Sequence, residues 1–491
     1  MTGRRGAAVR AGVVCLLVVA TVSTGVGAAS GDIEQSFTAA LGDGKTVRMT
    51  LEYRIPDRVT ELTARLPVAG AESTRVTELR GFRRTNATQF EWTGSDRPRV
   101  TLSLDADDDR VIAGDGWAFV VRPDVTVSYR YSGDEPDVVT TLAAGGEGYA
   151  AGPTAYLGPH RTTSTTAGDE RTTFVVSGAV GSVALQRARA FLRLAPGRFD
   201  LGIRQPSTTA FVIPARDQTE TGARVAGAAV ETSFWVEPDA LAFESTDTAF
   251  THEYVHTRLG VMGDGSTRWL TEATAEYFGH AFALNAGAGS YEGFRSDLAA
   301  DRYAPSRNAV TLSKPGTWRG TLADYDKGAL VLAALDAEIR RRTDGRYTLA
   351  DVFARNPGPY ADHAAFRAAV VRTTGVRSLG DWIDRYVTTD ALPPLPEDPS
   401  YFVYGPDLDP DGDGAASSAE TRQRTNPFIA DARTSTATTT PTPTPATTPV
   451  TPTPTPATPT TGVGDGFGAP GAATALGAAA LGAALLARRR R

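Results

Sequence analysis

The sequence is poor in cysteine, histidine and lysine. Its 491 residues include one cysteine and five histidines, and lysine occurs only at positions 45, 314 and 327. A single cysteine excludes a disulfide framework and a metal site built from thiolates. The formal net charge of −6 argues against nucleic-acid binding, which requires a basic face. A hydrophobic content of 41% excludes a wholly disordered chain, and the length predicts two folded domains with extensions.

Residues 1–29 predict a secretory signal peptide. Arg4, Arg5 and Arg10 precede an apolar run at 13–22, and small residues follow at 27–29 as a cleavage site. The alternative is an uncleaved membrane helix, but this run is short for a bilayer core of about 30 Å. We therefore expect an exported protein.

Residues 434–491 predict a surface stalk followed by a membrane anchor or sorting signal. Threonine, proline, alanine and serine make up nearly all of 434–461, a composition that stays extended and can carry O-linked sugars. Within 462–491 an apolar stretch precedes the basic cluster 488–491, as in a membrane helix with its positive charges inside. The segment 466–471, Gly-Phe-Gly-Ala-Pro-Gly, resembles the PGF-type sorting signals of archaeal surface proteins. The resemblance implies that an archaeosortase removes the tail and that a lipid anchors the protein at the cell surface.

Residues 30–176 predict an antiparallel β domain. Glycine, aspartate and proline separate short segments in which apolar and polar residues alternate or β-branched residues gather, at 47–55, 59–68, 99–104 and 125–131. Asn86 begins a glycosylation sequon, which places it on the surface of a secreted protein. The domain has no group of titratable residues that would indicate a catalytic site.

Residues 177–398 predict a catalytic domain of the α+β class. The expected elements are one helix that Pro196 and Gly197 end, two strands and a long helical region, at 181–195, 210–213, 224–236 and 238–387. The order of strands, then mixed elements, then helices favours an α+β lobe after a β lobe.

The segment 252–256, His-Glu-Tyr-Val-His, predicts a metal-binding helix. Residues four apart share one helix face, so the imidazoles of His252 and His256 can reach the same ion. Zinc suits this pair because it takes neutral histidine nitrogens in a tetrahedral set. Glu253 lies beside them, where it can take a proton from the attacking water. The polar residues 245–248 are suited to cap such a helix.

A second predicted helix supplies the third ligand. It starts at Trp269 after a glycine-rich turn at 260–265, and it places Glu272 where its carboxylate can reach the ion. Glu276 lies one turn further on the same face. It either holds the other ring nitrogen of a ligand histidine or is a solvated helix glutamate. With three ligands present, the remaining histidines, including His280, are not expected to bind the metal.

These segments resemble the gluzincin metallopeptidases, in particular the aminopeptidase-N and glycyl-aminopeptidase families. In those families a His-Glu-x-x-His helix precedes a Trp-Leu-x-Glu-Gly helix whose glutamate is the third zinc ligand. The match at 269–275 implies that role for Glu272, with Ala273 in place of the usual glycine. The segment 325–329, Tyr-Asp-Lys-Gly-Ala, resembles a family motif whose tyrosine stabilises the oxyanion, which implies that role for Tyr325. The resemblance also implies a thermolysin-like domain, mixed and then mainly helical, after a β domain.

A further family motif, Gly-x-Met-Glu-Asn, is only partly present. In the aminopeptidases its glutamate binds the free amine of the substrate. The corresponding segment 227–232 reads Gly-Ala-Ala-Val-Glu-Thr, so Glu231 is the candidate, although the spacing differs by one residue and methionine and asparagine are missing. The departure leaves both exopeptidase and endopeptidase activity open.

Residues 399–433 predict an acidic spacer that contains a calcium loop. The pattern D-x-D-x-D-G-x5-E begins at Asp409 and resembles the Ca²⁺ loops of dockerins and thrombospondin type-3 repeats. Carboxylates and one backbone carbonyl would coordinate the ion, from Asp409, Asp411, Asp413, Ala415 and Glu420. The alternative is an acidic linker that binds no ion.

The sequence as a whole predicts a secreted, surface-anchored zinc peptidase, with Ca²⁺ as a second cofactor. Its expected partners are a peptide or protein substrate, the membrane or a lipid anchor, and a sorting enzyme. One alternative is a non-catalytic surface or adhesion protein with a zinc-stabilised peptidase-like fold. Another is a zinc hydrolase that acts on a non-peptide substrate. Glu253 and Tyr325 favour an enzyme, because a structural zinc site needs neither.

Overall fold

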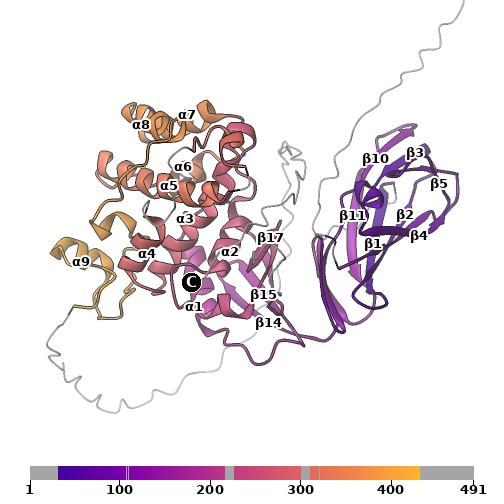
Figure 1. Cartoon of the computed structure of the whole chain (residues 1–491), viewed down its shortest axis with the longest axis horizontal. Coiled ribbons are helices and arrows are strands. Elements are labelled where there is room, and N and C mark those ends of the chain that lie inside the picture. The colour runs from indigo at the N-terminus through magenta and orange to yellow at the C-terminus, as the bar shows by residue number, and fades with distance from the viewer. Residues whose placement is uncertain are drawn as a thin grey trace, which may run out of the picture.

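The structure is a computed structural model, and it describes residues 31–431 apart from 107, 109, 216–225, 300–309 and 320. A β-rich N-terminal part is followed by a part in which helices cover a sheet (Figure 1). The predicted signal peptide, stalk and C-terminal anchor lie outside the described residues. Within the described ranges, none of the helices combines the length and the apolar character needed to cross a bilayer.

The N-terminal part is built from sheets whose strands mostly pair antiparallel. The first has the order β11-β1-β2-β7-β4, with bounds Val138–Ala144, Ile33–Leu41, Val47–Arg54, Arg99–Leu104 and Thr74–Arg80. The second has the order β10-β3-β6-β5, with bounds Thr126–Tyr131, Val59–Arg65, Gln89–Trp92 and Phe82–Arg84. The four segments predicted as strands in this region are confirmed, with ends shifted by up to three residues. One pair, β1 with β11, is parallel.

A third sheet separates this core from the second part of the chain. Its order is β12-β13-β9-β8, with bounds Gly148–Ala151, Thr154–Leu157, Trp117–Val121 and Val111–Gly114. Successive side chains of a strand point to opposite faces. Ala118 and Val120 accordingly join the core of the N-terminal sheets, whereas Trp117 and Phe119 pack against residues of the following sheet.

The sheet of the second part has the order β14-β15-β16-β18-β17. The strands span His160–Ala167, Glu170–Ser177, Ser207–Val212, Ser233–Val236 and Gly227–Val230. β15, β16 and β18 run parallel, and β17 forms an antiparallel edge. The edge position leaves one side of β17 without a neighbouring strand among the described residues.

Two local predictions in this region are wrong. The single strand expected at 224–236 is a hairpin of β17 and β18, because Glu231 turns the chain with a φ of 56°. The helix expected from Gly181 begins at Gln186 instead and includes Pro196. Proline in the last turn removes one donor, and the backbone N–H of Phe199 still closes the helix on Ala195.

The remaining helices follow the predicted helical region. They are α1 Gln186–Arg198, α2 Ala249–Leu259, α3 Trp269–Asn285, α4 Tyr291–Leu298, α5 Ala323–Arg342, α6 Leu349–Arg355, α7 His363–Thr374, α8 Ser378–Val387 and α9 Ser417–Gln423. α3 is buried on nearly every face because it lies between α2 and α5. Its polar side chains, Glu276 and His280 among them, therefore lie in the interior of the helical region.

Candidate metal centre

The residues of the centre come from two packed helices. Thr248 starts α2, since its side chain accepts a hydrogen bond from the backbone of Phe250, as the polar run before the helix predicts. α2 ends at Leu259, and the next residue is Gly260, whose φ of 60° suits glycine. The chain then reverses and enters α3, which packs along α2. The reversal brings the face of α3 that carries Glu272 opposite the histidines of α2.

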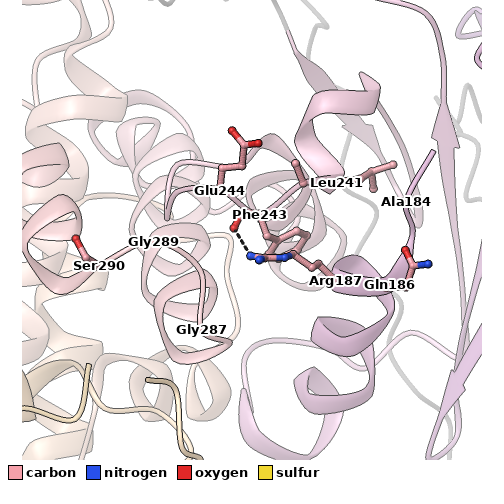
Figure 2. Close-up of a pocket in the computed structure, with 10 residues that line it drawn as sticks. Ala184, Gln186, Arg187, Leu241, Phe243, Glu244, Gly287, Gly289 and Ser290 are labelled. Atoms are coloured by element: carbon pink, nitrogen blue, oxygen red, sulfur yellow. Dashed lines mark hydrogen bonds between the residues drawn. The ribbon is translucent and has the colours of Figure 1, made fainter. Parts of the chain in front are cut away.

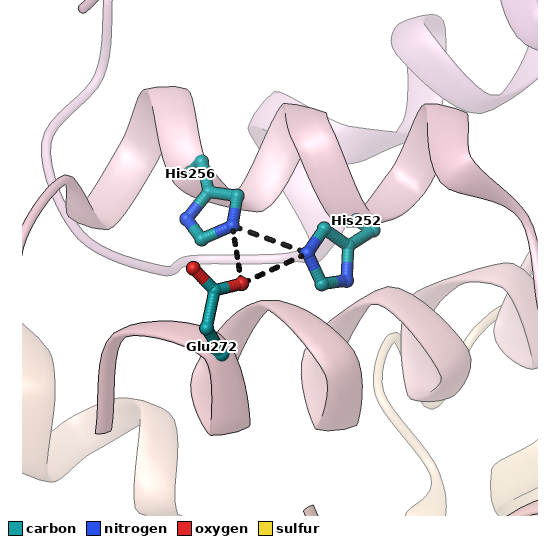
Figure 3. Close-up of side chains that lie close together, drawn as sticks. All are labelled: His252, His256 and Glu272. Carbon is teal, nitrogen blue, oxygen red and sulfur yellow. Dashed lines mark hydrogen bonds and ion pairs between the residues drawn. The ribbon is translucent and has the colours of Figure 1, made fainter. Parts of the chain in front are cut away.

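Three side chains converge between these helices (Figure 3). The Nε2 atoms of His252 and His256 lie 3.1 Å apart. Glu272 Oε2 lies 3.5 Å from Nε2 of His252 and 3.3 Å from Nε2 of His256. The sequence thus predicts the residues that the structure brings together here.

These atoms fit a zinc ion. Ligands about 2.0 to 2.1 Å from a tetrahedral ion lie roughly 3.3 Å from one another, which is the spacing of the three atoms. Two imidazole nitrogens and one carboxylate oxygen leave the fourth position for water or substrate, the donor set of a catalytic rather than a structural zinc site. His252, His256 and Glu272 would therefore hold the metal.

Glu276 links one of these histidines to a third. Its Oε2 accepts a hydrogen bond from His252 Nδ1 at 3.1 Å, and its Oε1 accepts one from His280 Nε2 at 3.2 Å. His280 Nδ1 lies 3.0 Å from the hydroxyl of Thr246. Burial opposes the ionisation of Glu276, but the hydrogen bonds from both imidazoles outweigh it and lower the pKa of the carboxyl group. Glu276 is thus a buried anion that orients a ligand histidine, one of the two roles that the sequence left open.

The centre is rich in negative charge. Burial would lower the pKa of His252, but hydrogen bonds to the carboxylates of Glu272 and Glu276 outweigh burial and raise it. The same groups that favour a proton on His252 favour a divalent cation at its Nε2.

Glu253 lies between the centre and the edge strand β17. Its side chain is 6% exposed, and the backbone of Ala229 hydrogen-bonds to it. A side chain added at Gly227 would meet the Cγ of Glu253 at 2.9 Å, so the strand backbone approaches this residue closely. Burial raises the pKa of the Glu253 carboxyl group, although the two histidines lower it. A carboxyl group in such surroundings is suited to accept and return a proton.

Tyr325 reaches the centre from the first turn of α5. Its ring stacks on the ring of His252, with centroids 5.8 Å apart and planes inclined by 9°. Burial and the neighbouring carboxylate of Glu272 raise the pKa of the phenol, which keeps it a hydrogen-bond donor. The structure thus places the predicted tyrosine beside the ligands from a helix about 70 residues away in the sequence.

Other predicted site residues lie apart from the three ligands. Glu231 lies in the turn after β17, and its charged neighbours are Arg122 and Asp124 of the N-terminal part. Burial raises the pKa of the Glu231 carboxyl group. Asn86 is exposed in the turn between β5 and β6, where its side chain hydrogen-bonds to Gln89. The predicted calcium residues gather near α9, remote in sequence from the zinc ligands.

His280 was not identified as part of the site by sequence reasoning. It is not among the three metal-ligand candidates, but it contacts Glu276 and is 3% exposed. The available signal was its position four residues after Glu276, because residues at this spacing share a helix face.

A separate hollow lies beside α1 (Figure 2). Its volume is about 940 Å³. Arg187 crosses it to donate a hydrogen bond to the carbonyl oxygen of Phe243 at 3.0 Å. None of the zinc-ligand candidates lines this hollow, which is bordered by Ala184, Gln186, Arg187, Leu241, Ala242, Phe243, Glu244, Gly287, Gly289 and Ser290.

Comparison with solved structures shows a similar fold. An aminopeptidase N family protein from Idiomarina loihiensis is 14% identical, with a TM-score of 0.54 over 74% of this chain and 77% of that chain. An M1 zinc metallopeptidase from Deinococcus radiodurans is 15% identical, with a TM-score of 0.48 over 75% of this chain and 95% of that chain. No protein-family model and no curated protein matches the chain. The first likeness agrees with the predicted order of a β domain and a mixed, then helical, domain.

Proposed function

We propose that the protein is a zinc-dependent peptidase that hydrolyses peptide bonds with an activated water molecule. The observation that carries the proposal is the convergence of His252, His256 and Glu272 with two further groups, Glu253 and Tyr325. A purely structural zinc site would need neither of these. The shared fold with a protein of the aminopeptidase N family supports the same reaction class.

The side chains have complementary tasks in this reaction. When bound, Zn²⁺ supplies a Lewis acid that polarises the scissile carbonyl and makes water acidic. Glu253 takes the proton of the attacking water and returns it to the leaving amine. The phenol of Tyr325 donates a hydrogen bond to the oxygen on which negative charge develops. Glu276 holds the ring of His252 in the orientation that presents Nε2 to the centre.

The edge strand β17 gives the substrate a place to bind. An extended peptide can add to an exposed sheet edge through backbone hydrogen bonds. β17 runs past Glu253, and Glu231 follows directly after its last residue. In this arrangement the Glu231 carboxylate binds the free amine of a peptide that lies along the strand. The proposed activity is therefore that of an aminopeptidase.

The proposal includes a location outside the cell. It rests on the signal-peptide pattern of residues 1–29 and on the stalk and apolar tail of 434–491. The substrates would then be peptides or proteins outside the cell, and the tail or a lipid would hold the enzyme on its membrane.

Product mapping on a peptide pool tests this function. The full chain, loaded with zinc, is incubated with peptides that have either free or acetylated amino termini, and mass spectrometry locates the cuts. We expect removal of amino-terminal residues from free peptides only, and a loss of about 10²- to 10⁴-fold in Glu253→Gln. The variant Glu231→Gln should lose the preference for free over acetylated peptides.

Each arm of this test can contradict one part of the proposal. Cuts within acetylated peptides at the same rate would exclude an aminopeptidase while leaving a peptidase. No cleavage by zinc-loaded wild type would exclude the peptidase and favour a non-catalytic surface protein or a non-peptide substrate.

A further inference from the structure

Residues 399–431 pack against the helical lobe, by which we mean the helices α1 to α8 of the second part. Phe402 and Phe428 both lie in its core, with ring centroids 6.1 Å and 5.9 Å from the ring of Tyr291 on α4. Tyr404 donates a hydrogen bond from its hydroxyl to Asp336 of α5 at 2.7 Å. The folded part of the chain therefore extends beyond α8 to the segment that carries the acidic residues.

Two overlapping groups of carboxylates lie in this segment. Asp409, Asp411 and Asp413 form one, and Asp413, Glu420 and Asp431 form the other, with ligand atoms within 4.8 Å of one another in each group. The twelve-residue loop pattern predicts four of these residues. Asp431 lies eighteen residues beyond Asp413, outside that pattern, and its backbone N–H lies 3.3 Å from Asp413 Oδ2.

Glu420 is the observation that points to a ligand. It lies on α9 and is 0% exposed, yet neither of its carboxylate oxygens has a hydrogen-bond partner. Oδ2 of Asp411 is also buried without a partner. An ionised carboxylate that is buried and unpaired is strongly unfavourable, so buried charges are normally paired or coordinate a metal. Among the described residues, Glu420 shares its group with the carboxylates of Asp413 and Asp431.

The negative charge around Glu420 also favours a bound cation. Carboxylates gather around Glu420, with ligand atoms within 4.8 Å of one another in the group that it forms with Asp413 and Asp431. A cation bound among these oxygens would offset the repulsion between their negative charges.

We propose that Asp409, Asp411, Asp413, Glu420 and Asp431 bind Ca²⁺, and that the ion clamps the end of the folded chain to the helical lobe. Ca²⁺ takes six to eight oxygen ligands at about 2.3 to 2.6 Å in flexible geometry. A set of carboxylates without nitrogen or sulfur donors suits such a hard cation rather than zinc. Because Asp431 joins the group, the ion fixes the chain from the loop through α9 to that residue.

The clamp has a mechanical consequence. Phe428 is seated in the core three residues before Asp431, and the threonine- and proline-rich sequence begins at residue 434. The ion therefore strengthens the attachment between the helical lobe and the segment that follows it. This role does not depend on the proposed peptidase activity.

Limited proteolysis with Ca²⁺ titration tests the clamp. The full chain is freed of divalent ions on a chelating resin, given back one equivalent of zinc and treated with trypsin at increasing Ca²⁺, up to about 1 mM, the range of extracellular calcium modules. Cleavage after two exposed residues, Arg422 in the last turn of α9 and Arg424 directly after the helix, is followed by mass spectrometry. At Ca²⁺ ten times above its Kd, we expect these cuts to slow about tenfold.

Matched variants separate the clamp from a general charge effect. Glu420→Gln and Asp431→Asn should each lose most of the Ca²⁺ protection. Asp431 is partly exposed, so Asp431→Asn tests the site without changing the buried residue Glu420 on α9. Asp407→Asn removes a charge from the same segment at an exposed residue paired with Arg198, and it should keep full protection. His256→Ala, which disrupts the zinc ligands, should also keep it.

Three results would overturn the proposal. They are absence of Ca²⁺ protection in the wild type, wild-type protection in folded Glu420→Gln, and wild-type protection in Asp431→Asn. The last would remove Asp431 from the site and with it the clamp. His256→Ala disrupts zinc binding without touching the acidic residues, so it shows whether Ca²⁺ protection requires the zinc site. The outcome for the clamp is therefore separate from the outcome for the proposed peptidase.

Discussion

At the residue scale, the site depends on side chains that support the zinc ligands as well as on the ligands themselves. Sequence spacing predicts His252, His256 and Glu272, because the helix repeat places the two histidines on one face and the motif supplies the third ligand. It could not decide the role of Glu276. That role depends on how closely α3 packs on α2, which is a property of the tertiary structure.

Removal of the His280 side chain nitrogens should weaken zinc binding. His280→Phe keeps a ring of similar size but takes away the hydrogen bond from His280 to Glu276, so Glu276 holds His252 less firmly. We expect zinc affinity to fall by about 10- to 100-fold. Competition with a chromophoric chelator measures the affinity.

His363→Phe is the matched control for this prediction. His363 pairs with Asp384 between α7 and α8, and it lies outside the metal-ligand group. Its variant should bind zinc like the wild type. Unchanged zinc affinity in folded His280→Phe would show that Glu276 orients His252 without help from His280.

At the element scale, the close approach of α3 and α5 positions Tyr325. A Cβ added at Gly328 would lie 2.6 Å from the Cβ of Ala273, so glycine is needed where the helices meet. Ala273 stands where the family pattern has glycine, and Gly328 accommodates its methyl group. The sequence predicts both helices but not this contact, since no local pattern states which residue faces which.

Gly328→Ala should separate zinc binding from catalysis. The added methyl group pushes α5 away from α3 and moves Tyr325, one turn earlier, away from the ligands, while both zinc helices stay in place. We expect a loss of stability of about 1 to 3 kcal/mol, measured by chemical unfolding. The rate of peptide hydrolysis should fall more than zinc affinity does.

Gly197→Ala provides the control at this scale. Gly197 is exposed within α1 and a Cβ there would meet no atom within 4 Å. This change should leave activity intact and, through helix propensity, should not lower stability. Equal peptide hydrolysis in Gly328→Ala and wild type would contradict the positioning role of the α3–α5 contact.

At the scale of the whole molecule, one sheet joins the two parts of the chain. Its outer face packs Trp117, Phe119 and Tyr156 against residues of the following sheet, including Phe211. Tyr156 also makes a 2.6 Å hydrogen bond with Ser177. The sequence predicts a β lobe before a mixed and helical lobe. It misses this junction because alternation alone does not say which sheet covers each face of a strand.

The sequence fails locally where one residue changes the direction of the chain. The hairpin at Glu231 has no glycine to mark it, so 224–236 reads as one strand. The predictions for the two ends of the chain rest on composition alone. They concern residues 1–30 and those after 431, which lie outside the described structure, so export and anchoring stay predictions.

The central claim is that a zinc ion held by three residues works with Glu253 as a base. The most direct test measures zinc content and peptide hydrolysis on the same samples of wild type, Glu253→Gln and Glu272→Ala. In Glu253→Gln we expect one zinc per chain and hydrolysis about 10²- to 10⁴-fold slower than in the wild type. In Glu272→Ala we expect reduced zinc. Wild-type hydrolysis by Glu253→Gln at equal zinc content would contradict the assigned base and the proposed peptidase chemistry.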